Sequence, residues 1–161
     1  MALLFTLPFQ DVSSNGTTGN WMTVAGIIAA NTAGYRGALR AITVTPAEVP
    51  VDDNLDCAIW RTNNAGAGTP GSSPTPVKKD PNSRASIMTA GLNYPNGSEP
   101  STFETTAAMN FAVNGRGGYT MAWSFDDAIK WGINQTICLR IQPVGYSTVI
   151  IVSGVLEFEE W

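Results

Sequence analysis

The chain has 161 residues, of which 43% are hydrophobic and 14% are charged, values that fit one folded domain. Nine Lys and Arg residues against thirteen Asp and Glu residues give a net charge of −4, which argues against a basic surface for nucleic acid. The sequence contains no histidine, which excludes histidine as a general acid or base and excludes every Ser-His or Cys-His nucleophile pair.

The first twenty residues divide into an apolar half and a polar half. The apolar half carries Leu3, Leu4, Phe5, Leu7 and Phe9. No basic residue precedes Arg36, so the run lacks the form of a signal peptide, and it is too short to cross a bilayer. We predict an arm and hinge over residues 1–20 whose five apolar side chains contact another subunit, and we expect the β domain to fold without residues 1–9. An edge strand of the same domain is the alternative.

Alternation of apolar and polar residues indicates strands through the rest of the chain. In residues 37–45, Ile42 and Val44 share one face and Thr43 points the other way, which is the period of a half-buried strand. The same reasoning gives strands, in chain order, over residues 21–29, 37–45, 55–62, 103–113, 118–125, 135–143 and 148–158. Turns rich in Gly, Pro and Asn separate them, as in sandwiches and barrels. The predicted fold is all-β, an antiparallel β-sandwich or jelly roll forming a single domain over residues 21–161.

Residues 63–100 interrupt this rhythm. They carry Pro70, Pro74, Pro76, Pro81, Pro95 and Pro100. A central strand does not accommodate that density of proline, because proline has no N–H for the ladder. We predict one long Pro- and Gly-rich loop, with a short edge strand at residues 85–89, that reaches over a neighbouring subunit. A flexible linker is the alternative.

The two cysteines lie in predicted strands. Cys57 and Cys138 have no CxxC spacing and no histidine to complete a zinc site. We expect two buried apolar side chains, with a disulfide between neighbouring strands as the alternative.

Carboxylates are the remaining candidates for chemistry. They are the pairs Asp52/Asp53 and Asp126/Asp127, together with Glu99 and Glu104. Neighbouring residues of an extended chain point in opposite directions, so neither Asp pair converges by itself, and solvated turns are the expected place for both. Residues 124–131 are long enough for one helical turn, with Ser124 at its start. We expect no catalytic residue, no metal site and no cofactor.

Tryptophan is frequent, at five positions. Trp60 and Trp123 are candidate sugar platforms, although tryptophans spread over several strands are more often core or interface anchors. A water-exposed indole at Trp161 is unfavourable, so we expect Trp161 to pack on its own domain or, by preference, on another subunit.

Several segments between residues 37 and 161 resemble small structural proteins of tailed bacteriophages. They are residues 38–46 (ALRAITVTP), 59–62 (IWRT), 79–81 (KDP), 99–101 (EPS), 114–119 (NGRGGY), 138–140 (CLR) and 156–160 (LEFEE). This resemblance implies a jelly-roll head decoration, or cement, protein that is homotrimeric and lies on the outer surface of a capsid. It carries no catalytic motif.

The expected function is therefore that of a non-enzymatic virion protein. It is made in the host cytoplasm, binds the major capsid protein and its own copies, and stabilises the head shell, without nucleic acid or membrane as a partner. The main alternative is a carbohydrate-binding jelly roll of a phage tail or surface structure that uses Trp60 or Trp123. A histidine-free glycosidase with Glu99 or Glu104 is a third hypothesis.

Overall fold

The computed structural model describes residues 2–14, 20–29, 36–47, 54–62, 68–144 and 150–161. Within these ranges the chain forms strands and no helix, so the predicted all-β class is confirmed. The strands are β1 (Leu3–Ser14), β2 (Met22–Ile28), β3 (Gly37–Pro46), β4 (Asn54–Arg61), β5 (Val77–Lys78), β6 (Thr89–Leu92), β7 (Met109–Asn114), β8 (Tyr119–Ala122), β9 (Ile129–Trp131), β10 (Thr136–Pro143) and β11 (Ile150–Glu160).

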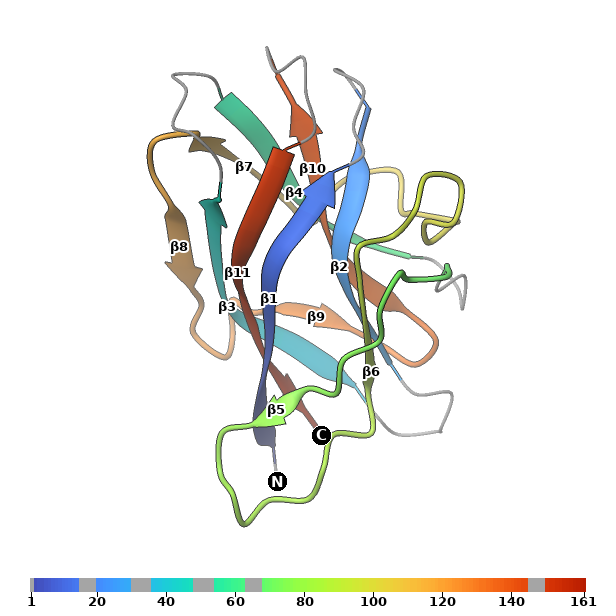
Figure 1. Ribbon diagram of the computed structural model, residues 1–161. Helices are drawn as coiled ribbons and strands as arrows, with labels where there is room; N and C mark the ends of the chain where they lie inside the picture. The colour runs from blue at the N-terminus through green and yellow to red at the C-terminus, as the bar shows by residue number, and fades with distance from the viewer. Residues whose placement is uncertain (1, 15–19, 30–35, 48–53, 63–67, 145–149) are drawn as a thin grey trace.

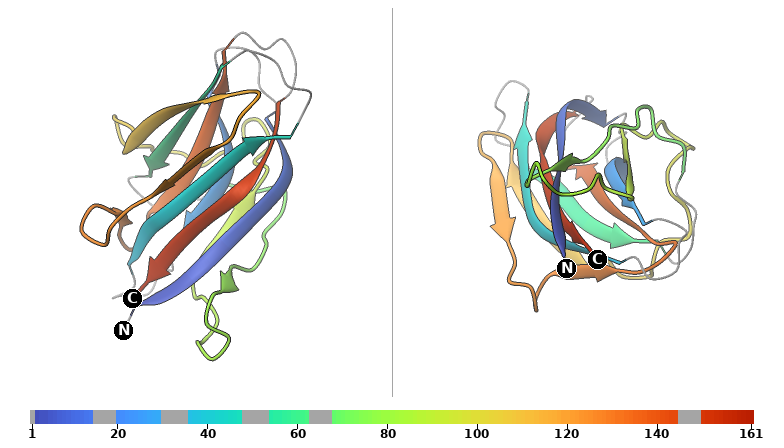
Figure 2. Two further views of the ribbon diagram at one scale, coloured as in Figure 1. Left: turned by 90° about the vertical axis from the view of Figure 1, so that its left-hand side faces the viewer. Right: turned by 90° about the horizontal axis from the view of Figure 1, so that it is seen from below.

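The strands form two antiparallel sheets packed face to face (Figure 1). The first sheet has the order β5-β1-β11-β3-β8, with β9 pairing to β3, and the second has the order β6-β2-β10-β4-β7. Strands β1, β11 and β3 run side by side across the first sheet (Figure 2, left). Apart from the short β5, β6 and β9, the strands follow the arrangement β1-β11-β3-β8 over β2-β10-β4-β7, which is that of a jelly roll.

Alternation located most of the long strands to within about two residues of their ends. The predictions for β2, β3, β4 and β10 agree closely with the structure, whereas β7 and β8 are shorter than predicted. The helical turn considered for residues 124–131 is instead a turn followed by β9, and Ser124 Oγ accepts a hydrogen bond from Asp127 N at 3.4 Å. The short edge strand expected at residues 85–89 lies later, as β6.

The predicted N-terminal arm is instead strand β1, which agrees with the alternative of a strand. Over residues 3–9, β1 pairs with β11 in unbroken register, from Leu3 opposite Glu160 to Phe9 opposite Gly154. Phe5 and Leu7 are fully buried and Phe9 is 3% exposed, so these three side chains belong to the chain's own core. They are therefore not available to a partner, because alternation along β1 turns them toward the second sheet. Because residues 3–9 supply a paired strand and three core side chains, we now expect their removal to destabilise the domain, contrary to the expectation from the sequence.

Leu3 and Leu4 are half-buried. Leu3 packs against the core, and Leu4 lies opposite Glu159 on β11 and accepts a backbone hydrogen bond from Lys79 N at 3.0 Å. Residues 15–19 of the predicted hinge lie outside the described residues.

The long excursion folds back onto its own domain (Figure 1). We call residues 68–100 the strap. Its strand β5 pairs with β1 in the first sheet, and its strand β6 pairs with β2 in the second. The strap thus joins the two sheet edges on one side of the sandwich, so its described part packs on this domain. An extension over a neighbouring subunit stays a prediction.

Candidate functional site

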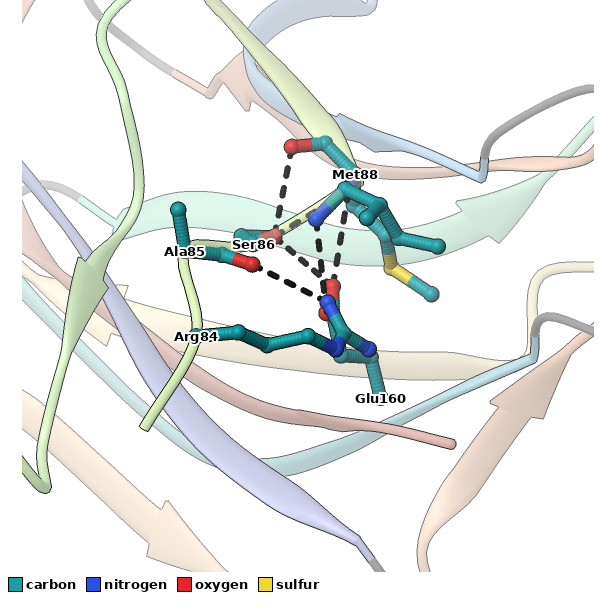
Figure 3. A network of polar contacts seen from close by, with 6 residues as sticks. Arg84, Ala85, Ser86, Met88 and Glu160 are labelled. Atoms are coloured by element: carbon teal, nitrogen blue, oxygen red, sulfur yellow. Dashed lines mark hydrogen bonds and ion pairs between the residues drawn. The ribbon is translucent and has the colours of Figure 1, made fainter. Parts of the chain in front are cut away.

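One carboxylate holds the strap to the end of β11. Glu160 is fully buried, and its carboxylate faces residues 84–88 of the strap (Figure 3). It accepts hydrogen bonds from Ser86 Oγ at 2.7 Å and from the backbone N–H groups of Ile87 and Met88 at 3.3 and 3.4 Å, and it forms an ion pair with Arg84. A buried carboxylate is stable only with such partners, so this contact fixes the strap.

A second carboxylate holds the end of the strap against the outer face of the second sheet. Glu99 Oε2 accepts hydrogen bonds from Thr23 N at 3.1 Å, Thr23 Oγ1 at 2.7 Å and Arg140 Nη2 at 3.1 Å. The Arg140 guanidinium also lies 4.3 Å from the ring centroid of Phe103. These contacts give Glu99 a structural role in the domain.

Glu104, the other acid of the glycosidase hypothesis, forms a separate ion pair. Its Oε2 accepts from Arg61 Nε at 3.0 Å, and Arg61 Nη1 donates to the carbonyl of Lys130 at 2.9 Å. The structure therefore gives Glu99 and Glu104 different partners on different elements. Asp126 and Asp127 are exposed in a turn, as expected, and Asp52 and Asp53 lie outside the described residues.

Tyr94 of the strap lies over two glycines of the second sheet. Gly26 and Gly91 face each other on β2 and β6, and a Cβ at Gly26 would lie 2.8 Å from the Tyr94 hydroxyl oxygen. Tyr94 is 1% exposed, and its hydroxyl has no hydrogen-bond partner among the described residues. Burial raises the pKa of Tyr94, so the hydroxyl stays neutral.

Both cysteines are free and fully buried, as expected. They lie on neighbouring strands but not opposite each other, because Cys57 pairs with Ile141 and Cys138 pairs with Trp60. Burial raises the pKa of both thiols, which disfavours the reactive thiolate.

The two candidate sugar platforms are both partly covered. Trp60 is half-buried and meets Phe103 edge-on, with 6.0 Å between the ring centroids. Trp123 is half-buried against the hydrophobic core. Both indoles thus take part in packing within the domain, and a sugar-binding role for either stays a prediction.

Trp161 packs on its own domain. Its N–H donates to the Arg36 carbonyl at 3.1 Å, and the Arg36 N–H donates to the Trp161 carbonyl at 3.0 Å, which joins the ends of β3 and β11. Its ring centroid lies 5.9 Å from that of Phe125. Trp161 is half-buried within the domain, which agrees with the first of the two options for this residue. Packing on another subunit stays a prediction.

An aromatic and cationic surface surrounds Trp161. We call it the Phe125 patch, and its members are Arg36, Phe125, Lys130, Ile133 and Trp161. Phe125 is 48% exposed and Ile133 is 38% exposed. Lys130 Nζ lies 5.0 Å from the centroid of the Phe125 ring, within the range of a cation–π interaction. Large exposed apolar side chains that lie beside cations are typical of binding surfaces.

A cavity of about 340 Å³ opens within this patch. Its lining residues are Arg36, Lys130, Trp131, Gly132, Ile133, Gln135 and Trp161. The Trp131 ring packs against Gly37, where a Cβ would overlap the indole, and the contact of Arg61 with the Lys130 carbonyl holds β9 in place. The walls of the cavity therefore belong to paired strands and to the turn after β9.

Sequence reasoning identified Trp161 but not the other members of the patch. Phe125 fell within a predicted strand, so no sequence signal indicated that its side chain is exposed. Arg36 and Lys130 are far apart in the sequence. The one usable signal was the Ser-Phe-Asp-Asp run, in which an aromatic residue lies among turn residues.

A scan against protein-family models and a search of curated proteins found no match. Within the part of the chain that the structure describes, no group of three or more His, Cys, Asp or Glu side chains is placed to hold a metal ion. Over the same residues, no helix is long and apolar enough to span a membrane.

Proposed function

We propose that this chain is a non-enzymatic capsid decoration protein, which binds the major capsid protein from the outer surface of a virion and stabilises the head shell. The observation that carries the proposal is the Phe125 patch, an exposed aromatic and cationic surface on a jelly roll. Jelly rolls occur among viral capsid proteins and lectins, and the sequence resembles phage structural proteins, although a fold alone does not define a function.

The way the fold uses its acidic side chains supports a binding role. Glu99, Glu104 and Glu160 each accept hydrogen bonds from groups on other strands or from the strap. Their charge is therefore used to hold the domain together. A decoration protein needs such a rigid body, since binding then costs little ordering of its own chain.

Homotrimerisation belongs to the same proposal. Three copies that engage the shell together gain avidity, provided that the geometry permits simultaneous contact, so each individual contact need not be strong. With a net charge of −4, the decorated particle would also repel nucleic acid and not adsorb it.

The direct test is binding to shells assembled from the major capsid protein of the virus that encodes this chain. We expect the chain to sediment with the shells and to raise their resistance to heat. Phe125→Ala should weaken binding by about tenfold or more, because aromatic anchors dominate interface energies. The matched control is Val77→Ala, since Val77 is 53% exposed on the strap, outside the patch.

Absence of co-sedimentation by the wild-type chain at micromolar concentrations would refute the proposed function. Equal loss of binding in Phe125→Ala and Val77→Ala would leave decoration intact but remove the patch as its carrier.

A further inference from the structure

The polar side chains that line the cavity of the Phe125 patch can all donate hydrogen bonds. Arg36 and Lys130 bear only N–H groups in their side chains. The Trp131 Nε1–H is buried and has no acceptor among the described residues. The Gln135 side-chain oxygen already accepts from Gly132 N at 2.8 Å, which leaves its amide nitrogen to donate. Among the described residues, no Asp or Glu side chain lines the cavity, and the Trp161 main-chain oxygen accepts a hydrogen bond from Arg36 N at 3.0 Å.

The two cations of the cavity are not neutralised by the rest of the described chain. Neither Arg36 nor Lys130 has a carboxylate within ion-pairing distance among those residues. Arg40, which also lies near the Phe125 ring, differs, because its Nε is 3.7 Å from Glu159 Oε1. The cavity is thus a local positive site in a chain of net charge −4.

We propose that this cavity binds the carboxylate of an Asp or Glu side chain in an acidic segment of a partner protein. The inference rests on the proposed function and makes it specific, because it states which chemistry the capsid protein must present. A carboxylate accepts charge-assisted hydrogen bonds from Arg36 and Lys130, so an anionic acceptor complements the two cations of the cavity.

The surroundings of the cavity favour a protein segment over an acidic sugar. Ile133 lines the cavity and Phe125 lies beside it, next to Lys130 and Trp161, and both apolar side chains are more than a third exposed. An acidic residue flanked by apolar residues covers this rim, whereas a sugar acid bound in the cavity leaves it in water. Aromatic and arginine side chains near the centre of a patch are also what protein interfaces concentrate.

The test combines the shells with a spectroscopic readout at Trp131. In shell sedimentation, Arg36→Gln and Lys130→Gln should each weaken binding by about tenfold or more, and added salt should weaken wild-type binding more than variant binding. Lys78→Gln removes the same charge from the strap and should bind as wild type. Binding by Arg36→Gln and Lys130→Gln equal to that of Lys78→Gln would overturn the inference while leaving the decoration function standing.

The second arm titrates the wild-type chain with the peptide Ac-Glu-Leu-Glu-Leu-Glu-NH₂ and follows the assigned indole Nε1–H signal of Trp131 by NMR. We expect a saturable shift that the Gln-Leu-Gln-Leu-Gln analogue does not produce. If the wild-type chain does not bind shells but the acidic peptide gives this shift, the proposed function is wrong and the carboxylate site is supported. No shift at millimolar peptide, or a shift with tri-galacturonate alone, overturns the acidic-segment proposal.

Discussion

The strap and the Phe125 patch use charge in opposite ways. Around the strap, the carboxylates of Glu99 and of Glu160 on β11 each accept several hydrogen bonds, and these contacts are made inside the domain. In the patch, the cations of Arg36 and Lys130 line a cavity that has no Asp or Glu side chain among its described lining residues. Charges that are paired within the domain stabilise its fold, whereas charges without a counterion in the domain can bind one from a partner. The strap is therefore a structural region of this molecule, and the patch is the region that we propose for binding.

The largest effect on stability is expected at Glu160, the centre of the strap network. Glu160→Ala leaves the Ser86 hydroxyl and two backbone N–H groups without an acceptor, so we expect a loss of about 2–4 kcal/mol in the free energy of unfolding. Urea denaturation measures it. The control is Glu157→Ala on the same strand, whose ion pair with Lys79 is partly exposed and is expected to be worth less than about 1 kcal/mol. Equal losses in the two variants would contradict the structural role of Glu160.

Glu99 provides the next test. Glu99→Gln keeps the shape of the side chain but leaves the Arg140 cation without its counterion, and we expect a loss of about 1–3 kcal/mol. Thermal unfolding measures the change, and Glu104→Gln, whose partner Arg61 is more exposed, should lose less. An unchanged melting temperature in Glu99→Gln would show that this end of the strap is not held by charge.

Substitution of Tyr94 should raise the free energy of unfolding, the opposite of the two preceding changes. Because its buried hydroxyl has no partner among the described residues, Tyr94→Phe is expected to stabilise the domain by about 0.5–1 kcal/mol. A matched change at Tyr119, which is half-buried and donates to Met121 Sδ at 3.1 Å, should not stabilise it. Destabilisation by Tyr94→Phe would mean that the hydroxyl finds a partner in solution.

The smallest effect on stability is expected in the patch itself. Arg36→Gln and Lys130→Gln break no ion pair among the described residues, so each should change the free energy of unfolding by less than about 0.5 kcal/mol. Chemical denaturation checks this in the same samples that are used for the binding tests. A loss of unfolding free energy as large as that of Glu99→Gln would show that Arg36 and Lys130 stabilise the fold. The contrast between the patch and the strap would then be wrong.

The sequence predicted those parts of the fold in which neighbouring residues alone carry the signal. The alternation through Ile42 and Val44 marks β3, and the same period marks β10, because a half-buried strand requires it. Strands β5 and β6 carry no such signal, since they are short and exist only through their pairing with β1 and β2. The apolar period of β1 was visible, but whether its inner face meets the domain's own core or a partner is decided by distant residues.

The site was less predictable than the fold for the same reason. Trp161 stood out because of its chemistry, but its neighbours Phe125, Lys130 and Arg36 come from different strands and turns. Only the pairing of β3 with β9 and β11 brings them together. Glu99 and Glu104 were candidate catalysts in the sequence and became counterions in the structure, because their partners are likewise distant along the chain.

The pairing of β1 with β11 has a kinetic consequence. Phe5 lies opposite Phe158, so the centre of the first sheet joins segments from the two ends of the chain. Closing a loop of that length is entropically costly before any contact repays it, and sandwiches rich in such pairings fold slowly, on timescales of about milliseconds to seconds. During synthesis the apolar face of β1 therefore stays exposed to solvent until β11 has left the ribosome. This interval, and not the finished domain, is where we expect the chain to be most prone to aggregation.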